Sequence, residues 1–430
     1  MTVPNLRPTF DNAGLQREIM RLRGVDNVTN LVYLAGEYLS LIVVAGSAVL
    51  FAQYRGSWGL AWSWNIPVFA LAMVLIGGIQ HRLAGLGHEA SHYSFMKNRF
   101  LNDFVPDVLC MFPLMTTVHF YRLFHMAHHQ FTNDPERDPD LQNLGHGKRA
   151  QEFPMSRGRF VRVIYLGLLV APIRFVQYQW AYFQVNTLGQ GKNEYVRAST
   201  AGTGNAGPWP RLGTVLGFAY LLGFNALTWV LTNTDRVHWL VPAGLLGIGL
   251  AAGVTHALPD WAVFRSPFRQ AYSTRFGGVA RLAYFTMLLE VLAHLRWLTG
   301  GVSAVYFTVL WLVPLTTSFM FFMFLRDVYQ HSNADAGRLT NSRVFFTDSF
   351  TRWAVFVYGQ DMHIPHHLFP AIPHYRLRRL HELLKQDHAL YREQVIETHG
   401  TFHDPEGRRT ILDEMTKPQS SPALGPVGTV

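Results

Sequence analysis

The chain has 430 residues, and its composition excludes an ordinary soluble protein: 49% of the residues are hydrophobic and only 15% are charged. That balance is typical of a protein with membrane spans. The net charge of +9 is modest for this length and is scattered between apolar stretches, which indicates loop charge rather than a nucleic-acid surface. The single cysteine, Cys110, excludes an intrachain disulfide framework and a thiolate cluster.

The first 30 residues form an N-terminal segment in which GLQREIMRLRGV predicts a short amphipathic helix at the membrane interface. After this segment, six stretches are long enough and apolar enough to suggest spans, since a span needs about 20 apolar residues. They cover residues 31–53, 56–80, 212–234, 237–259, 282–298 and 299–325.

Two stretches complicate this count. The fifth, 282–298, is the weakest because Glu290 and Arg296 interrupt it, so four spans is the alternative. Glu290 lies four residues before His294, and this pair is either a functional intramembrane site or an interfacial helix end. The stretch 160–178 contains two arginines, and we expect it on the membrane surface rather than across the bilayer.

Arginine and lysine concentrate before the first span and after the second, fourth and sixth spans. The positive-inside rule then places both termini and the two large polar regions, 81–211 and 326–430, in the cytoplasm. The sequence therefore predicts an all-α, polytopic transmembrane domain over residues 31–385 with a cytoplasmic helical cap. Residues 386–430 are expected to form a cytoplasmic tail, disordered after about residue 416 because its composition is rich in Pro, Gly and Ser.

Histidines gather in three short boxes within the two cytoplasmic regions. His88 and His92 in GHEASH are four residues apart, and HMAHH places three histidines on one helical face. HIPHH repeats the spacing of HMAHH, but Pro365 fits only the first turn of a helix. We therefore expect His363 to lie where a helix begins. The members of the last two boxes are His125, His128, His129, His363, His366 and His367.

These eight histidines predict a shared metal site. A catalytic zinc takes three protein ligands and a structural zinc takes four, so one zinc would leave several of them unused. Eight imidazoles suit two metal ions with open positions, although imidazole binds iron, zinc, copper or nickel and does not name the metal. H-E-x-x-H alone also fits a zinc metalloprotease with Glu89 as general base. A metal transporter is the non-enzyme alternative.

GHEASH, HMAHH and HIPHH, with an apolar block before the third, resemble the boxes of the membrane fatty acid desaturase and hydroxylase superfamily. HHQFTNDPERDPDL and HHLFPAIPHYRLRRLHELL are similar to stretches of its acyl-lipid desaturase branch. The resemblance implies a di-iron site in the cytoplasmic cap that uses O2 and two electrons to desaturate a fatty acyl chain of a lipid or thioester. A hydroxylase or ketolase on the same scaffold is the close alternative. The resemblance also implies a ninth ligand, for which His331 is the candidate.

Several acidic residues flank the boxes and are candidates to accept the second ring N–H of a ligating histidine. Asp327 lies four residues before His331 and is expected to orient it or to reach the metal through water. His81 and His119 are left out because their spacing does not match, and His374 and His381 are interpreted as surface or supporting residues. The other acidic candidates are Glu89, Asp134, Asp138, Asp140 and Asp361.

The sequence shows no pattern for a fused electron-transfer module. We therefore expect a separate electron donor with its reductase, such as a ferredoxin or a cytochrome of the b5 type. Arg149, Arg157 and Arg159 are candidates either to dock an acidic carrier or to hold anionic lipid headgroups. The expected location is the cytoplasmic membrane of a bacterium, with no nucleic-acid partner.

Overall fold

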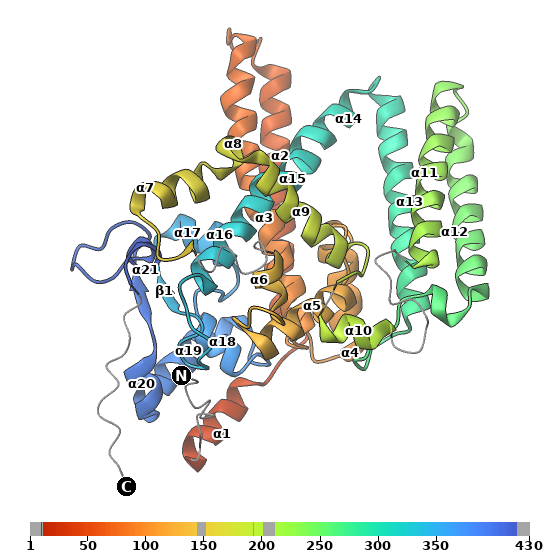
Figure 1. Ribbon diagram of the computed structural model, residues 1–430. Coiled ribbons are helices and arrows are strands. Elements are labelled where there is room, and N and C mark those ends of the chain that lie inside the picture. Colours follow the sequence, from red (N-terminus) through yellow and green to blue (C-terminus); the bar gives the residue numbers. More distant parts are fainter. Residues whose placement is uncertain (1–9, 11, 144–151, 192, 201–210, 419–430) are drawn as a thin grey trace.

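The computed structural model describes residue 10 and residues 12–143, 152–191, 193–200 and 211–418. Its secondary structure is almost entirely helical (Figure 1). The exception within these ranges is a two-stranded parallel sheet of β1 (Val344–Phe346) and β2 (Glu397–His399). The predicted helical fold class is confirmed.

Six helical segments are long and apolar enough to cross a membrane, which supports six spans rather than four. The fifth is longer than the predicted 282–298 because it begins at Thr274, where the Ser273 side chain caps the helix. The spans are α2 (Thr29–Tyr54), Trp62–Ser91 with α3 (Asn65–Ser91), α11 (Leu212–Asn233), Val237–Ala257 with α12 (Leu240–Ala257), α13 (Thr274–Leu298), and Val302–His331.

The sixth span is a broken helix. α14 (Val302–Phe307) continues through a π-helical turn into α15 (Val313–Thr316), and α16 (Ser318–His331) starts after a distorted residue, Thr317. Pro314 has no N–H to donate and its ring crowds the preceding turn, which accounts for the π-helical turn at Thr308–Leu312. α16 then packs against α3.

A glycine allows α3 and α16 to approach closely. A Cβ at Gly77 would lie 2.1 Å from Ser318 Oγ, and the Ser318 hydroxyl donates to the Met73 carbonyl at 2.7 Å. From this contact both helices run on to a histidine, His88 near the end of α3 and His331 at the end of α16. The close packing therefore brings two of the predicted ligands to the same region.

The charged residue inside the first span is paired. Glu37 is buried and accepts hydrogen bonds from Arg82 Nε at 2.8 Å and from the Tyr358 hydroxyl at 2.6 Å. A buried carboxylate is costly unless it is paired and hydrogen-bonded. These contacts link α2 to α3 and to the cap.

The helices α11, α12 and α13 pack on one another and stand beside the histidine-bearing body (Figure 1). Glu290 of α13 lies against Gly244 of α12, where a Cβ would overlap its carboxylate. His294 faces the backbone carbonyl of Glu290 at 3.0 Å. Neither side chain belongs to the histidine clusters described below.

Short helices and the small sheet form the cap around the ends of α3 and α16. Leu15 and Ile19 of α1 (Ala13–Leu22) are buried in a core shared with α19 (Leu377–Asp387), so the predicted amphipathic helix is present, and its place at the membrane interface stays a prediction. The cap helices are α1 (Ala13–Leu22), α4 (Arg99–Pro106), α5 (Val118–Phe131), α6 (Pro139–Asn143), α10 (Glu194–Thr200), α17 (Ser349–Ala354), α18 (His363–Leu368), α19 (Leu377–Asp387), α20 (Ala389–Gln394) and α21 (Ile411–Thr416).

The stretch 160–178 forms the short helices α7 (Arg157–Phe160) and α8 (Gly167–Val170) and the start of α9 (Pro172–Asn186), and none of these is a candidate span. Residues 386–418 pack onto the domain rather than extending from it. β2 pairs with β1, and Glu414 of α21 forms a buried ion pair with Arg343. The stretch expected to be disordered lies, from residue 419 on, outside the described residues.

Candidate metal centre

The nine predicted ligands come from four helix ends. His88 lies in the last turn of α3 and His92 is the residue that caps it. α5 provides the second box from one face, and His331 is the last residue of α16. α18 begins at His363, as expected from the position of Pro365.

The structure brings all nine histidines together in two adjacent clusters. In each cluster the available ring nitrogens lie within 4.8 Å of one another, close enough to bind one metal ion. The five-histidine cluster consists of His88, His92, His125, His129 and His366, and the four-histidine cluster of His128, His331, His363 and His367. Their role as metal ligands stays a prediction.

Within each cluster the Nε2 atoms converge. His125 Nε2 lies 2.8 Å from His92 Nε2 and 3.0 Å from His129 Nε2. His129 Nε2 is also 3.1 Å from His366 Nε2. In the four-histidine cluster, His363 Nε2 is 2.9 Å from His331 Nε2 and 3.0 Å from His367 Nε2.

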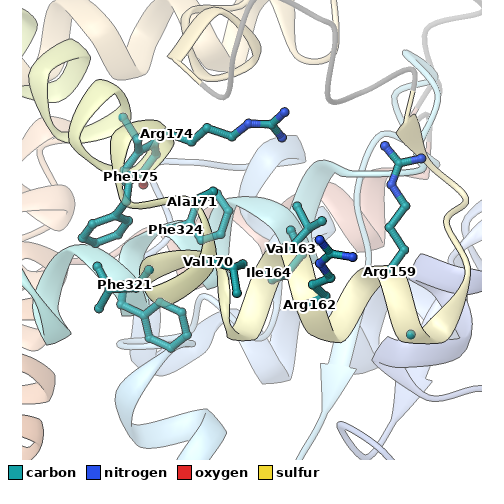
Figure 2. A pocket seen from close by; sticks show the side chains of 14 residues that line it. Arg159, Arg162, Val163, Ile164, Val170, Ala171, Arg174, Phe175, Phe321 and Phe324 are labelled. Atoms are coloured by element: carbon teal, nitrogen blue, oxygen red, sulfur yellow. The ribbon is translucent and has the colours of Figure 1, made fainter.

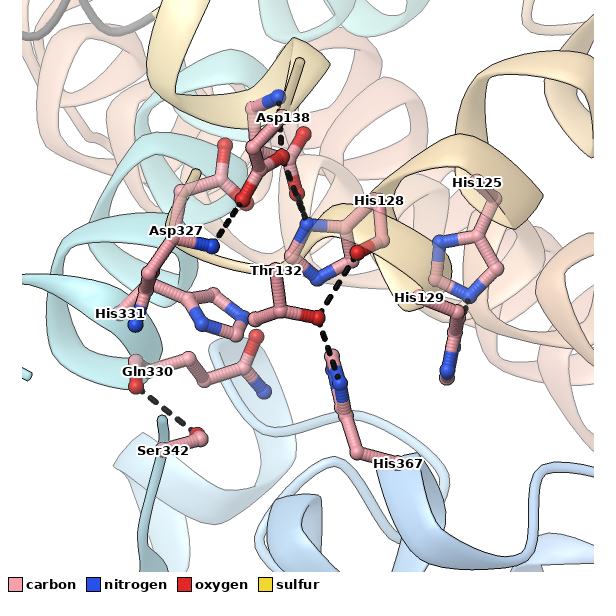
Figure 3. A network of polar contacts seen from close by, with 12 residues as sticks. His125, His128, His129, Thr132, Asp138, Asp327, Gln330, His331, Ser342 and His367 are labelled. Atoms are coloured by element: carbon pink, nitrogen blue, oxygen red, sulfur yellow. Dashed lines mark hydrogen bonds and ion pairs between the residues drawn. The ribbon is translucent and has the colours of Figure 1, made fainter. Parts of the chain in front are cut away.

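The Nδ1 contacts of the four-histidine cluster fix the ring protons (Figure 3). His331 Nδ1 faces the Asn341 carbonyl at 3.2 Å, so it must be the donor. The Thr132 hydroxyl donates to the His128 carbonyl and therefore accepts from His367 Nδ1 at 3.2 Å. A neutral imidazole has one N–H. The Nε2 atoms of His331 and His367 are consequently acceptors, each facing another Nε2.

Two carboxylates complete this arrangement at His128. Its Nδ1 lies 3.0 Å from Asp138 Oδ1 and 3.2 Å from Asp140 Oδ2, all three side chains being buried. Burial alone would lower the pKa of His128, but the two carboxylates outweigh it and raise the pKa to about 9. Asp138 and Asp140 therefore make the contact with His128 that was predicted; that this contact orients a metal ligand stays a prediction.

Six other clustered histidines have, among the described residues, no nearby carboxylate that offsets the effect of burial on the pKa. Burial is the main cause that lowers the pKa of each ring well below its ordinary value, and neighbouring imidazoles lower it further. Neutral imidazole is the form that binds metal. The rings outside the membrane spans for which this holds are His92, His125, His129, His363, His366 and His367.

The remaining acidic candidates differ in their contacts. Glu89 Oε1 lies 3.4 Å from His88 Nδ1, while Glu89 Oε2 accepts from Ser94 Oγ and the His374 backbone N–H. Asp134 instead pairs with Arg137, and Asp361 pairs with Arg352. Among the described residues, neither carboxylate contacts a clustered histidine. Asp134 lies in a turn, where it accepts hydrogen bonds from the backbone N–H groups of residues 136 and 137.

Asp327 does not orient His331, whose Nδ1–H goes to the Asn341 carbonyl. Its Oδ2 accepts hydrogen bonds from the hydroxyls of Tyr178 at 2.8 Å and Tyr182 at 2.7 Å, and its Oδ1 pairs with Arg326. The i, i+4 spacing placed the two residues on one helix face, but α9 packs against that face and supplies closer donors. Thr132 and Asn341 were missed because a hydroxyl or backbone carbonyl carries no spacing signal.

Three buried histidines outside the clusters, His81, His374 and His381, contact other protein groups. His374 and His381 are buried rather than exposed. His374 Nε2 lies 2.9 Å from Asn30 Oδ1, and His381 contacts Tyr391 and Glu397. His81 Nδ1 faces the Ala354 carbonyl at 2.7 Å. Leaving His81 and His119 out of the ligand set agrees with the clusters.

A cavity of about 400 Å³ is separated from the five-histidine cluster by the Tyr121 side chain. The Tyr121 side chain lines it and stacks on the His125 ring, with centroids 5.2 Å apart. Arg326 lines the cavity as well. Val176 and Trp180, which also line it, are 60% and 55% exposed, so the cavity extends to the outer surface of α9. Most other lining residues are apolar, including Met111, Leu114, Phe319, Met320 and Met323.

Comparison with known proteins points to one family. The profile of the fatty acid desaturase family matches residues 62–263 and 236–399. Dihydrorhizobitoxine desaturase from Bradyrhizobium elkanii is 32% identical over 129 residues, which are 30% of this chain and 33% of that protein. An sn-1 oleoyl-lipid 12-desaturase from Arthrospira platensis is 23% identical over 306 residues, 68% of this chain and 61% of the relative.

A second sn-1 oleoyl-lipid 12-desaturase, from Anabaena variabilis, is 34% identical over 100 residues, 23% of this chain and 26% of that protein. The matched part of the chain thus spans less than two thirds of the length of each of these relatives. The family match itself covers most of the chain and all three histidine boxes. It decides against the metalloprotease and transporter interpretations: the chain belongs to the fatty acid desaturase family, a family of enzymes.

Proposed function

We propose that this protein is an integral-membrane desaturase in which the nine histidines hold two iron ions and a fatty acyl chain of a lipid or thioester is the substrate. The observation that carries the proposal is that two Nε2 acceptors, those of His331 and His367, face the same atom, His363 Nε2, at 2.9 and 3.0 Å. A neutral His363 has one ring proton and can donate to only one of them, so at least one contact joins two acceptors, which repel unless a cation lies between them.

The donor set fits a pair of metal ions. When two imidazole nitrogens bind the same ion at about 2.1 Å and the two metal–nitrogen bonds are at right angles, the nitrogens lie about 3 Å apart. This is close to the observed Nε2 spacings of 2.8 to 3.1 Å. Iron is one of the metals that imidazole suits. When bound, the two ions supply the O2-dependent oxidation of an unactivated C–H bond.

The chain's own residues position the substrate and exclude water. The apolar cavity beside α9 has the shape and chemistry for an acyl chain, which would enter past Val176 and Trp180. Tyr121, on His125, marks the end at which the reacting carbons would lie. Asp138 and Asp140 face His128 Nδ1, and Thr132 accepts from His367 Nδ1, so Nε2 is the atom that each ring would offer to a metal ion, with loss of a proton in the case of His128.

Desaturation removes two hydrogens from adjacent carbons and, with O2, two electrons and two protons, gives a double bond and two waters. The electrons would come from a separate donor, a ferredoxin or a cytochrome of the b5 type with its reductase. The metal centre, the polar loops and both described ends of the chain would face the cytoplasm of a bacterium.

The test combines metal analysis with product analysis. The full chain is expressed in a bacterial host, purified and assayed for metals, and the host's lipids are analysed for new products. We expect two irons per chain and a new double bond in acyl chains. One zinc per chain would contradict the proposal. Hydroxylated or keto products would show that the enzyme is a hydroxylase or ketolase rather than a desaturase.

The cytoplasmic location has its own test. Cysteines replace exposed residues in a background lacking Cys110, and intact cells are labelled with a thiol reagent that does not cross the membrane. Ser57→Cys, in the turn of the first hairpin, should be labelled, whereas Ser156→Cys and Glu406→Cys should be protected until the cells are opened. Labelling of Ser156→Cys in intact cells would contradict a cytoplasmic metal centre.

A further inference from the structure

A second cavity lies on the outer side of α16, away from the histidines. It has a volume of about 680 Å³ and is enclosed by α7, α8, the start of α9, and two phenylalanines of the sixth span, Phe321 and Phe324. Figure 2 shows three arginine side chains at its margin, Arg159, Arg162 and Arg174, above an apolar floor. Nothing in the proposed reaction uses this cavity.

The charge of the cavity is entirely positive. None of its 14 lining residues is acidic. Arg159 has an ion pair with Glu152 at 3.4 Å, and exposed pairs of this kind contribute little. Arg162 and Arg174 are exposed and have no hydrogen-bond or ion-pair partner among the described residues. Two guanidinium groups are therefore available to an anion.

The surroundings are apolar. Leu169, Ile173 and Val176 are 78%, 72% and 60% exposed, and they lie on the same segment as Arg162 and Arg174. Exposed apolar side chains flanked by basic residues are typical of a segment lying in a membrane interface. The floor residues Phe321 and Phe324 belong to a candidate membrane span, which favours lipid over water as the neighbour of this face.

We propose that this cavity binds the phosphate group of an anionic membrane phospholipid, with its acyl chains against Phe175, Phe321 and Phe324. Guanidinium groups bind phosphate through paired N–H donors. The site is separate from the acyl cavity, because Phe175 and Tyr178 of α9 line one and Val176 and Gln179 line the other. An acidic protein would meet the same arginines, but it would leave the apolar side chains in contact with water.

The experiment measures lipid binding to the full chain in detergent by native mass spectrometry, with phosphatidylglycerol, phosphatidylcholine and inorganic phosphate as probes. The wild-type protein should retain phosphatidylglycerol in preference to phosphatidylcholine. The double variant Arg162→Gln/Arg174→Gln should bind phosphatidylglycerol about 30-fold more weakly, since each basic residue near an anionic lipid contributes about five- to sixfold. Arg162→Lys/Arg174→Lys should keep part of the affinity.

The matched control is Arg378→Gln/Arg379→Gln, which removes the same charge from the exposed face of α19. It should leave phosphatidylglycerol binding unchanged. Metal content should equal that of the wild type in both double variants, which shows that each has folded. Because the binding assay needs no turnover, its failure and the failure of the proposed desaturation are distinguishable.

Three results would overturn the proposal. Equal binding of phosphatidylglycerol by the Arg162→Gln/Arg174→Gln variant would remove the arginines from the site. Competition by inorganic phosphate at the concentration at which phosphatidylglycerol binds would indicate a site for a free anion. Unchanged lipid binding by the Arg162→Gln/Arg174→Gln variant, together with slower electron transfer to it from the electron donor, would indicate that the arginines dock that donor protein instead.

Discussion

The two histidine clusters differ in how their rings are held. In the four-histidine cluster, three rings have an Nδ1 partner: a carboxylate for His128, a backbone carbonyl for His331 and a hydroxyl for His367. In the five-histidine cluster, Nδ1 of His88, His129 and His366 has no hydrogen-bond partner among the described residues. One cluster is thus oriented by hydrogen bonds, and the other mainly by packing.

This difference has a consequence for metal binding. Partners of the Nδ1 atom fix the tautomer and the direction of a ligating ring. We expect the four-histidine cluster to bind its metal more tightly and the five-histidine cluster, next to the acyl cavity and Tyr121, to exchange its metal more readily. Substitutions in one cluster should therefore affect the metal of that cluster more than the metal of the other.

The largest effect should follow from removing one ligand of each cluster. His125→Ala should lose mainly the metal of the five-histidine cluster, and His363→Ala mainly that of the four-histidine cluster. Each should lower activity by more than 100-fold, since even changes behind a ligand cost about 10–100-fold. Iron per chain, measured on purified protein, should fall from two to about one.

The control for both is His256→Ala, because His256 is an exposed histidine at the end of α12 outside the clusters. It should keep two irons and full activity. Two irons in His125→Ala or in His363→Ala would show that the corresponding cluster is not a metal site.

A smaller effect is expected for Asp138→Asn. The amide cannot hold the proton on His128 Nδ1 as the carboxylate does, so metal affinity of the four-histidine cluster should fall about 10–100-fold. Competition with a chelator measures this change. Asp134→Asn, in the neighbouring turn but paired only with Arg137, should behave like the wild type, and equal losses in the two variants would contradict a specific role for Asp138.

Thr132→Val keeps the shape of the side chain and removes the acceptor for His367 Nδ1. A hydrogen bond of this kind contributes about 0.5–1.5 kcal/mol, so the affinity of the four-histidine cluster should fall only about 3–10-fold. The same chelator competition measures it. A loss as large as that of His363→Ala would mean that Thr132 does more than orient one ring.

The smallest effect concerns acid stability away from both clusters. Burial alone would raise the pKa of Glu397, but hydrogen bonds from His381 and Lys385 outweigh it and lower the pKa to about 2. A lowered pKa stabilises the fold above the unfolded value of about 4.3, and this contribution is lost as the pH falls toward 2. Glu397→Gln should therefore remove about 1 kcal/mol at pH 6, allowing for solvent screening, and almost nothing at pH 2.

Thermal unfolding at the two pH values gives this difference, with metal content as the internal control. Glu397→Gln should retain two irons, since β2 lies outside the clusters. A loss of iron in this variant would show that the cap sheet and the metal centre are coupled.

The sequence by itself predicted six spans, with four as the alternative, and the eight histidines of the boxes, while the family resemblance added His331. Spans are visible because about 20 apolar residues are needed to cross a bilayer, and each histidine box keeps its ligands on one helix face through local spacing. Such local patterns do not depend on how distant segments pack. Even the beginning of α18 at His363 follows from the restricted backbone of Pro365.

Only the tertiary structure decided how these histidines divide into two sets. Neighbours in the sequence separate: His128 and His129 belong to different clusters, as do His366 and His367. The division depends on the close approach of α3 and α16 at Gly77 and on partners such as the Thr132 hydroxyl, which lies 235 residues before His367 in the chain. Packing between distant segments sets these contacts, and a single sequence carries no periodic signal for them.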